Sequence, residues 1–242
     1  MSIGDGDEER GSEMRVSGRS GGVRVAGACA IAVVVATLTA GCSAEKIAGQ
    51  ATATADSFAP SSDERDPSLR IRGVVVTEIA PGQQHVRPNQ RVAYPTIPPV
   101  GGPHDAQWAA CTGVVYSKAL RTENAVHSLE HGAVWIAYDP AKVSPQDQAV
   151  LSAKVTDRQY TLMSPIPDMD HPISLQSWGH QLPLDDANDE RIDQFIVALR
   201  ENPYTTPEVG ATCSSPLFDR ADPPPYDPTP PGPDAVPMSG IR

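Results

Sequence analysis

Residues 127–140 have the sequence HSLEHGAVWIAYDP. Two histidines stand four residues apart at its start, the spacing that places side chains on one face of a helix. Gly132 then follows, where such a helix would stop, and GAVWIAY (132–138) is an apolar run of strand length closed by Asp139-Pro140. The stretch therefore predicts a short helix that passes directly into a buried strand.

Local sequence patterns on both sides of this stretch predict the other elements. Ser144 is a favoured N-cap and Pro145 a favoured first helical residue, which predicts a helix that runs through Arg158. Residues 83–108 are proline-rich and are predicted to be irregular. The remaining predictions are strands at 70–79, 159–163 and 173–178 and a helix at 186–200. Together they predict a single α+β domain, a small mixed β-sheet with helices packed on it.

Composition excludes several classes of protein. The chain has 242 residues, 39% of them hydrophobic, and only 4 Cys, which excludes a collagen-like or disulfide-dense chain. Its net charge is −11 and it has no run of Lys and Arg. Because phosphate contacts need clustered basic residues, we expect no nucleic-acid partner.

The beginning of the chain resembles a bacterial export signal. Arginines at 15, 19 and 24 precede the uncharged residues 25–38, which as a helix would reach about 21 Å, short of the roughly 30 Å hydrocarbon core. LTAGC (38–42) then resembles a lipobox, which implies cleavage before Cys42 and a lipid on its sulfur. We expect an extracytoplasmic protein anchored to the outer face of the cell membrane. Because residues 1–13 are acidic, translation is predicted to begin at Met14.

Composition also divides the rest of the chain. Residues 42–68, rich in Ala, Ser and Thr, are predicted to be a lipidated flexible tether after a signal peptide at 1–41. The α+β domain is predicted at 69–215. Residues 216–242 hold nine prolines and are predicted to form an extended or disordered tail.

Two cysteines lie in the predicted domain, Cys111 and Cys213. In an oxidising cell envelope such a pair favours a disulfide. Closing a loop of about 100 residues stabilises a fold by about 4.7 kcal/mol in the chain-entropy model. The alternative is a Cys111 thiolate that acts as a nucleophile or metal ligand, although no C-x-x-C pattern supports redox chemistry.

The histidines form the candidate functional site. His127 and His131 could reach one metal ion, with Glu130 as a ligand or an orienting carboxylate. His104, at the end of a Gly-Pro loop, is the predicted third ligand, and His85 lies in the same irregular stretch. Imidazole suits copper and zinc, and Met163 and Met169 would add soft ligands for Cu(I). The protein would then buffer or transfer the ion.

Two other functions are compatible with this pattern. H-S-L-E-H matches H-x-x-E-H of inverted zinc peptidases, with Glu190 or Glu201 available as a further ligand. Against it, the strand at Gly132 ends the helix where such an enzyme continues it. The other alternative is an envelope interaction protein without metal, in which the His-Glu cluster is a hydrogen-bonded structural element and the Pro-rich tail meets a protein partner.

Several of these motifs together resemble one bacterial family. They are PPVGGPH (98–104), Trp108, Cys111, HSLEHGAVWIAYDP (127–140) and Ser177-Trp178-Gly179. The chain resembles the family called domain of unknown function 3105 over residues 70–215, with Thr112 where that family commonly has Gly. The resemblance implies an exported or membrane-anchored actinobacterial protein without a settled activity. Its characteristic polar positions correspond here to His104, Glu123, His127, Glu130 and His131.

Overall fold

A computed structural model describes residues 54–80 and 85–239 of the chain. The predicted signal peptide, the start at Met14 and the lipidation of Cys42 lie outside the described residues. Within the described ranges, no helix is long and apolar enough to cross a membrane.

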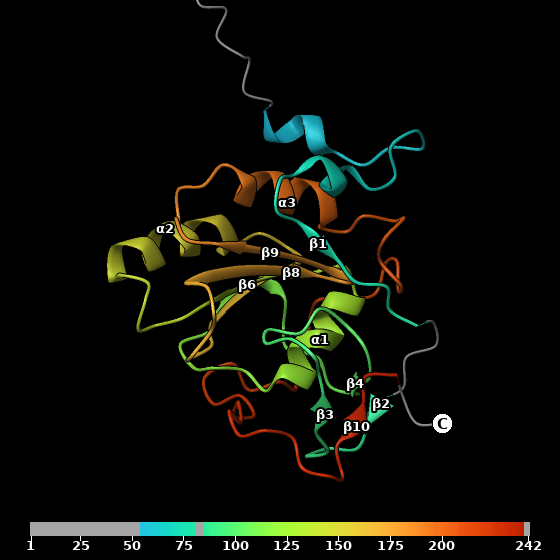
Figure 1. Ribbon diagram of the computed structural model, residues 1–242, viewed down its shortest axis with the longest axis vertical. Coiled ribbons are helices and arrows are strands. Elements are labelled where there is room, and N and C mark those ends of the chain that lie inside the picture. Colours follow the sequence, from blue (N-terminus) through green and yellow to red (C-terminus); the bar gives the residue numbers. More distant parts are fainter. Residues whose placement is uncertain (1–53, 81–84, 240–242) are drawn as a thin grey trace, which may run out of the picture. The chain divides into compact units, whose positions relative to one another are not determined.

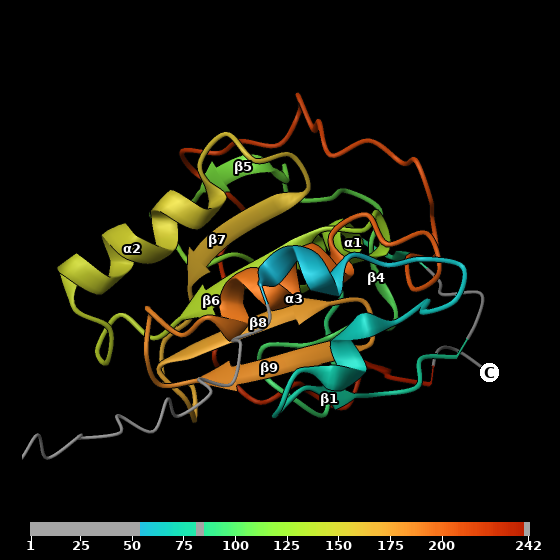
Figure 2. The ribbon, with the colours of Figure 1, turned by 90° about the horizontal axis from the view of Figure 1, so that it is seen from above.

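The centre of the molecule is a six-stranded mixed sheet in the order β1-β9-β8-β6-β7-β5. Strands β5, β7 and β6 are parallel to one another, while β8, β9 and β1 continue the sheet antiparallel (Figure 2). The bounds are β1 Val75–Val76, β5 Thr112–Val115, β6 Val134–Tyr138, β7 Thr161–Pro165, β8 Ile173–Ser177 and β9 His180–Leu184. The predicted fold class, an α+β domain with a small mixed sheet, is confirmed.

Helices cover both faces of this sheet (Figure 1). α2 (Pro145–Val155) and α3 (Arg191–Leu199) lie on one face, and α1 (Thr122–Glu130) lies on the other. Strand β6 contributes to both cores because alternate residues of a strand point to opposite faces. Ile136 packs with α2 and α3, whereas Trp135 packs with α1. Burial on both faces explains why GAVWIAY is apolar throughout.

The predicted helices are confirmed, and so is the predicted start of α2. The Ser144 hydroxyl accepts a hydrogen bond from the backbone N–H of Asp147 at 3.2 Å, and Pro145 is the first residue of α2. α2 ends at Val155, before the predicted Arg158, because Thr156 leaves the helical conformation and Asp157 has a φ of +59°. The helix predicted at 186–200 is shorter, because Asp186 to Glu190 form turns before α3 begins.

The strand predicted at 70–79 is wrong over most of its length. Its first residue belongs to a 3-10 helix, η2 (Pro67–Arg70), and only Val75–Val76 pairs with the sheet. Gly73 has a φ of +92°, and the Val74 N–H bonds back to the Ile71 carbonyl, so the chain turns here. The β-branched run therefore lies mostly after the turn.

Several strands were not predicted. Gly113 in β5 and Pro183 in β9 interrupt the sequence pattern of a strand, although both strands pair within the sheet. Within the irregular proline-rich stretch there are three two-residue strands, and a fourth, from the C-terminal segment, pairs with β3. These are β2 His85–Val86, β3 Val92–Ala93, β4 His104–Asp105 and β10 Val236–Pro237.

The flexible tether is contradicted for residues 54–68. A 3-10 helix, η1 (Ala55–Phe58), and η2 pack against α3. Phe58 is buried in the core that α2 and α3 form with the sheet, and the Arg70 guanidinium lies 4.4 Å from the Phe58 ring centroid. One aromatic anchor outweighs the Ala/Ser/Thr composition on which the prediction relied.

The disordered tail is contradicted for residues 216–239. Phe218 is buried against the core of α1, and Val236 is buried where β10 pairs with β3. Between them Arg91 donates to the backbone carbonyls of Thr229 and Asp227, at 2.7 and 3.0 Å. The prolines disfavour helix and longer strands here, but they also reduce the conformational freedom that is lost when an extended segment docks.

Candidate metal centre

The end of α1 presents the histidines. Gly132 has a φ of +94°, and its N–H bonds to the Leu129 carbonyl while the Ala133 N–H bonds to the Ser128 carbonyl. These two bonds define a Schellman motif, which requires a left-handed residue and so favours glycine. His131 is therefore the C-cap residue, one turn beyond His127 on the same helix face.

A second pair of histidines comes from the irregular stretch. β2 and β4 are parallel, and His85 is the direct partner of His104 in their register. Both rings lie against His127, with ring centroids 4.9 Å and 4.7 Å from its own. The His85 and His104 rings are 5.1 Å apart, so these three rings form a triangle, and the His131 ring joins the cluster 4.6 Å from His127.

Three of these rings are oriented by backbone carbonyl groups. The Nδ1 atoms of His104, His127 and His131 lie 2.8, 2.7 and 2.9 Å from the carbonyl oxygens of Gly102, Asp105 and Thr212, respectively. A carbonyl oxygen only accepts, so each Nδ1 carries the proton and each neutral ring presents a lone pair at Nε2. Metal-binding histidines in proteins are commonly held in this way.

Burial keeps two of the rings unprotonated at neutral pH. Desolvation lowers the pKa of His127 to about 4, with a contribution from the neighbouring histidines and an opposing one from the Asp105 carbonyl. Desolvation also lowers the pKa of His131, although the Thr212 carbonyl and nearby carboxylates oppose it. Both rings are thus available as neutral ligands.

Within residues 54–80 and 85–239, the potential ligand atoms fall into two groups that share His127. The first group is His85, His104, His127 and Glu130, and the second group is His127, His131 and Glu208. Within each group the ligand atoms lie within 4.8 Å of one another. In a tetrahedral zinc site with bonds of about 2.0–2.1 Å, ligand atoms are about 3.3 Å apart. Small side-chain movements would therefore bring the four atoms of the first group, or the three of the second group, to the distances of a zinc shell, with one position of the second shell left open.

This grouping differs from the predicted ligand set of His104, His127, His131 and Glu130. The structure places His131 with Glu208 and brings His85 into the group of His104. Glu208 was missed because it lies 77 residues after His131 and no local pattern marks it. Glu190 and Glu201, considered as peptidase ligands, belong to neither group among the described residues.

Glu123 lies outside the site. Its Oε1 accepts a hydrogen bond from the Val92 backbone N–H at 2.9 Å, and its Oε2 is 3.4 Å from Arg121 Nε. Its carboxylate thus anchors β3 to the start of α1, a structural role. Met163 and Met169 also lie elsewhere, packed in the two hydrophobic cores.

His104 and Glu130 are in direct contact within the first group. His104 Nε2 is 2.9 Å from Glu130 Oε2, and the His104 side chain is fully buried. No hydrogen bond of acceptable direction reaches this nitrogen from any described residue. Burial raises the pKa of Glu130, whereas a hydrogen bond from a protonated His104 and the positive charges of protonated His104, His127 and His85 lower it overall, so a proton on His104 competes with a metal ion at this contact.

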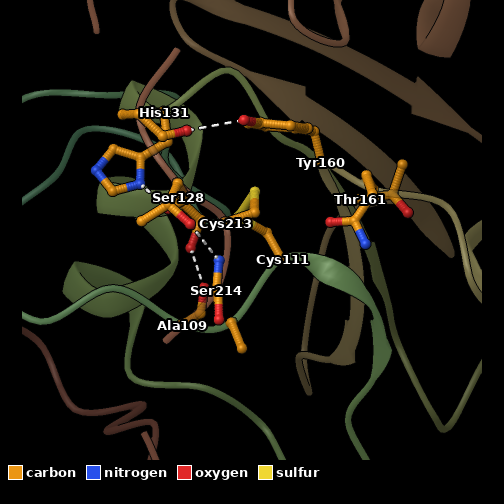
Figure 3. Close-up of a disulfide and its surroundings, with 12 residues drawn as sticks. Ala109, Cys111, Ser128, His131, Tyr160, Thr161, Cys213 and Ser214 are labelled. Carbon is orange, nitrogen blue, oxygen red and sulfur yellow. Dashed lines mark hydrogen bonds between the residues drawn. A yellow bond between two sulfur atoms is a disulfide. The ribbon is translucent and has the colours of Figure 1, made fainter. Parts of the chain in front are cut away.

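The predicted disulfide joins Cys111 to Cys213, with the sulfur atoms 1.95 Å apart. Figure 3 shows it beside Ser128 and His131 of the α1 end. The Cys111 N–H also donates to the Cys213 carbonyl, so two strands of chain are held together there. Because Thr212 directly precedes Cys213, the disulfide fixes the carbonyl that orients His131.

Fold and site together define a class: an α+β domain with a partly buried His/Glu cluster between a helix end and two short strands. A family model described as protein of unknown function (DUF3105) matches residues 85–215, more than half of the chain. The chain therefore belongs to this family, whose matched region contains all the residues of both groups. No curated protein and no solved structure matches the chain.

Proposed function

We propose that this protein is a lipid-anchored protein of the cell envelope that binds a divalent transition-metal ion, Zn²⁺ or Cu²⁺, for buffering or transfer. The first group holds the ion, with His104, His127 and Glu130 as buried ligands and His85 as an exposed one. Imidazole and carboxylate donors suit these two ions. With Met163 and Met169 in the cores, nothing in this donor set favours Cu⁺.

The observation that carries the proposal is the buried Nε2 of His104. Its Nδ1 proton is already donated to the Gly102 carbonyl, so in the neutral ring Nε2 is a lone pair that faces a charged carboxylate at 2.9 Å. Two buried acceptors in contact are unfavourable without a partner between them. A cation bound by both atoms, and by His127 beside them, satisfies this pair.

His180 provides an internal comparison. Its Nδ1 also faces a backbone carbonyl, that of Trp178, and its Nε2 lies 3.0 Å from Asp66 Oδ2. Here the direction is that of a hydrogen bond, and the pair joins η2 to the sheet. The His180–Asp66 pair is thus a structural hydrogen bond, whereas the His104–Glu130 contact lacks that geometry.

The test is metal content after dialysis. Purified wild-type protein, loaded with Zn²⁺ and dialysed at neutral pH, is expected to retain at least one ion per chain. His127→Ala removes a ligand common to both groups and should lower zinc affinity by about tenfold or more. The matched control is His171→Ala, because His171 is exposed and belongs to neither group. Wild-type protein without stoichiometric zinc would overturn the proposal.

The anchor is tested separately. Cys42→Ala removes the sulfur that would carry the lipid. In cells of an actinobacterial host, the wild-type protein should sediment with membranes and the variant should not, since a lipid contributes about 0.8 kcal/mol per buried CH₂. An unchanged distribution would exclude lipid anchoring at Cys42 and would leave the metal site unaffected.

A further inference from the structure

We propose that the second group, His127, His131 and Glu208, is a second position for the same divalent ion, and that ions pass between the two positions through His127. This inference rests on the proposed function of the first group. It concerns residues that the sequence pattern does not bring together, since Glu208 joins α1 only in the fold.

The shared ligand carries the argument. His127 Nδ1 donates to the Asp105 carbonyl, so only Nε2 can bind an ion in either group. That atom has one lone pair and binds one ion at a time. The two positions therefore compete for His127. An ion in the first position leaves His131 and Glu208 to hold a second ion, which must bind more weakly.

Each group has one exposed ligand, and the ligands between these two are buried. His85 is exposed in the first group and the Glu208 side chain is 54% exposed in the second, while His104, His127 and His131 are buried. The His127 ring is nearly equidistant from its neighbours, 4.7 Å from His104 and 4.6 Å from His131. An ion can thus exchange ligands stepwise from one group to the other, with His127 bound throughout.

The second position is held by rigid parts of the fold. His131 Nε2 lies 3.5 Å from Glu208 Oε2, and its Nδ1 is fixed by the Thr212 carbonyl beside the disulfide. The Glu208 N–H donates to the Glu130 carbonyl, which ties its loop to the last turn of α1. The indole of Trp108 covers the rings of both His127 and His131. Two imidazoles and one carboxylate suit Zn²⁺ or Cu²⁺.

Zinc titration of the full domain tests this inference. With Zn²⁺ as the probe and calorimetry as the readout, the wild type should bind a first ion tightly and a second more weakly. Glu208→Gln should lower the second affinity by about tenfold or more and change the first by less than about threefold. Glu78→Gln, an exposed glutamate outside both groups, is the matched control and should preserve both steps.

Release kinetics provide the second readout. Zinc transfer from the singly loaded protein to a chelator should be slower in Glu208→Gln than in the control, because the exit through the second group is removed. A single binding step that Glu208→Gln does not alter, together with unchanged release, would overturn the second position and leave the first intact. No zinc binding at all would overturn the proposed function as well.

Discussion

At the scale of single residues, Glu130→Gln distinguishes a metal site from a buried ion pair. A glutamine amide would donate to the His104 Nε2 lone pair that the carboxylate now faces at 2.9 Å. We expect the free energy of unfolding of the metal-free protein to stay level or rise by about 1 kcal/mol. Zinc affinity should fall, because a charged ligand is lost. Denaturant unfolding without and with Zn²⁺ measures both.

A loss of stability in metal-free Glu130→Gln would have a different meaning. If His104 is protonated and pairs with Glu130, then glutamine breaks a buried ion pair. That would destabilise the metal-free protein by about 3 kcal/mol or more. Such a loss, in the presence of a chelator and with Glu78→Gln unchanged, would identify the contact as structural.

Asp66 is expected to make folding sensitive to acid. Burial raises the pKa of Asp66, but the hydrogen bonds from His180 and Ser68 outweigh this and lower it below its ordinary value. A depressed folded pKa stabilises the native state above the unfolded value, about 3.9. That contribution is lost as the pH falls through the lower, folded value.

Comparison with Asp66→Asn isolates this contribution. The wild type should be more stable than Asp66→Asn at pH 6, and the difference should shrink below about pH 4. Thermal unfolding across this range measures it. A difference that is constant from pH 6 to pH 3 would contradict the assignment.

At the scale of elements, the N-cap of α2 offers a local test. The Ser144 hydroxyl accepts from the Asp147 N–H and contacts its carboxylate at 2.8 Å. Ser144→Ala should lower the free energy of unfolding by about 1 kcal/mol, whereas Ser144→Asn should retain most of the stabilisation that the cap provides. Equal losses in both variants would show that the cap does not contribute.

Elements with strong local signals could be predicted from the sequence. α2 has an N-cap serine followed by proline, and β6 is an apolar run buried on both faces. β9 could not be predicted, because its Pro183 argues against a strand and its pairing with β8 depends on a turn at Gly179. The strand at 70–79 was wrong because Gly73 turns the chain, and a glycine alone does not show which φ it adopts.

The site residues also differ in whether a local sequence pattern could predict them. His127 and Glu130 could be singled out because they share one helix, where spacing determines which side chains are neighbours. His85 is placed beside His104 by the pairing of β2 with β4, and Glu208 is placed by the disulfide-bonded segment. These are contacts over long sequence separations, and no local periodicity encodes them.

At the scale of the whole molecule, the two ends of the described chain complete the fold. Residues 54–71 cover α3 on one face of the sheet, and residues 216–239 extend along the side of α1 and β3 (Figure 1). Residues 54–68 were predicted to be flexible from their Ala, Ser and Thr content, and residues 216–239 to be extended or disordered from their prolines. A few anchors, Phe58, Phe218 and Val236, are sufficient to dock them.

The disulfide connects this global order to the site. Cys111 and Cys213 are 102 residues apart, so the bond restricts the unfolded chain strongly. Replacing both with alanine should lower the free energy of unfolding by up to about 4.7 kcal/mol in the chain-entropy model, with strain neglected. Since Thr212 orients His131, the variant that still folds should lose affinity at the second group more than at the first. Denaturant unfolding of the double variant and of the oxidised wild type measures the first effect, and zinc titration of both proteins measures the second. Equal losses of zinc affinity at the two groups would show that the disulfide stabilises the fold without shaping the site.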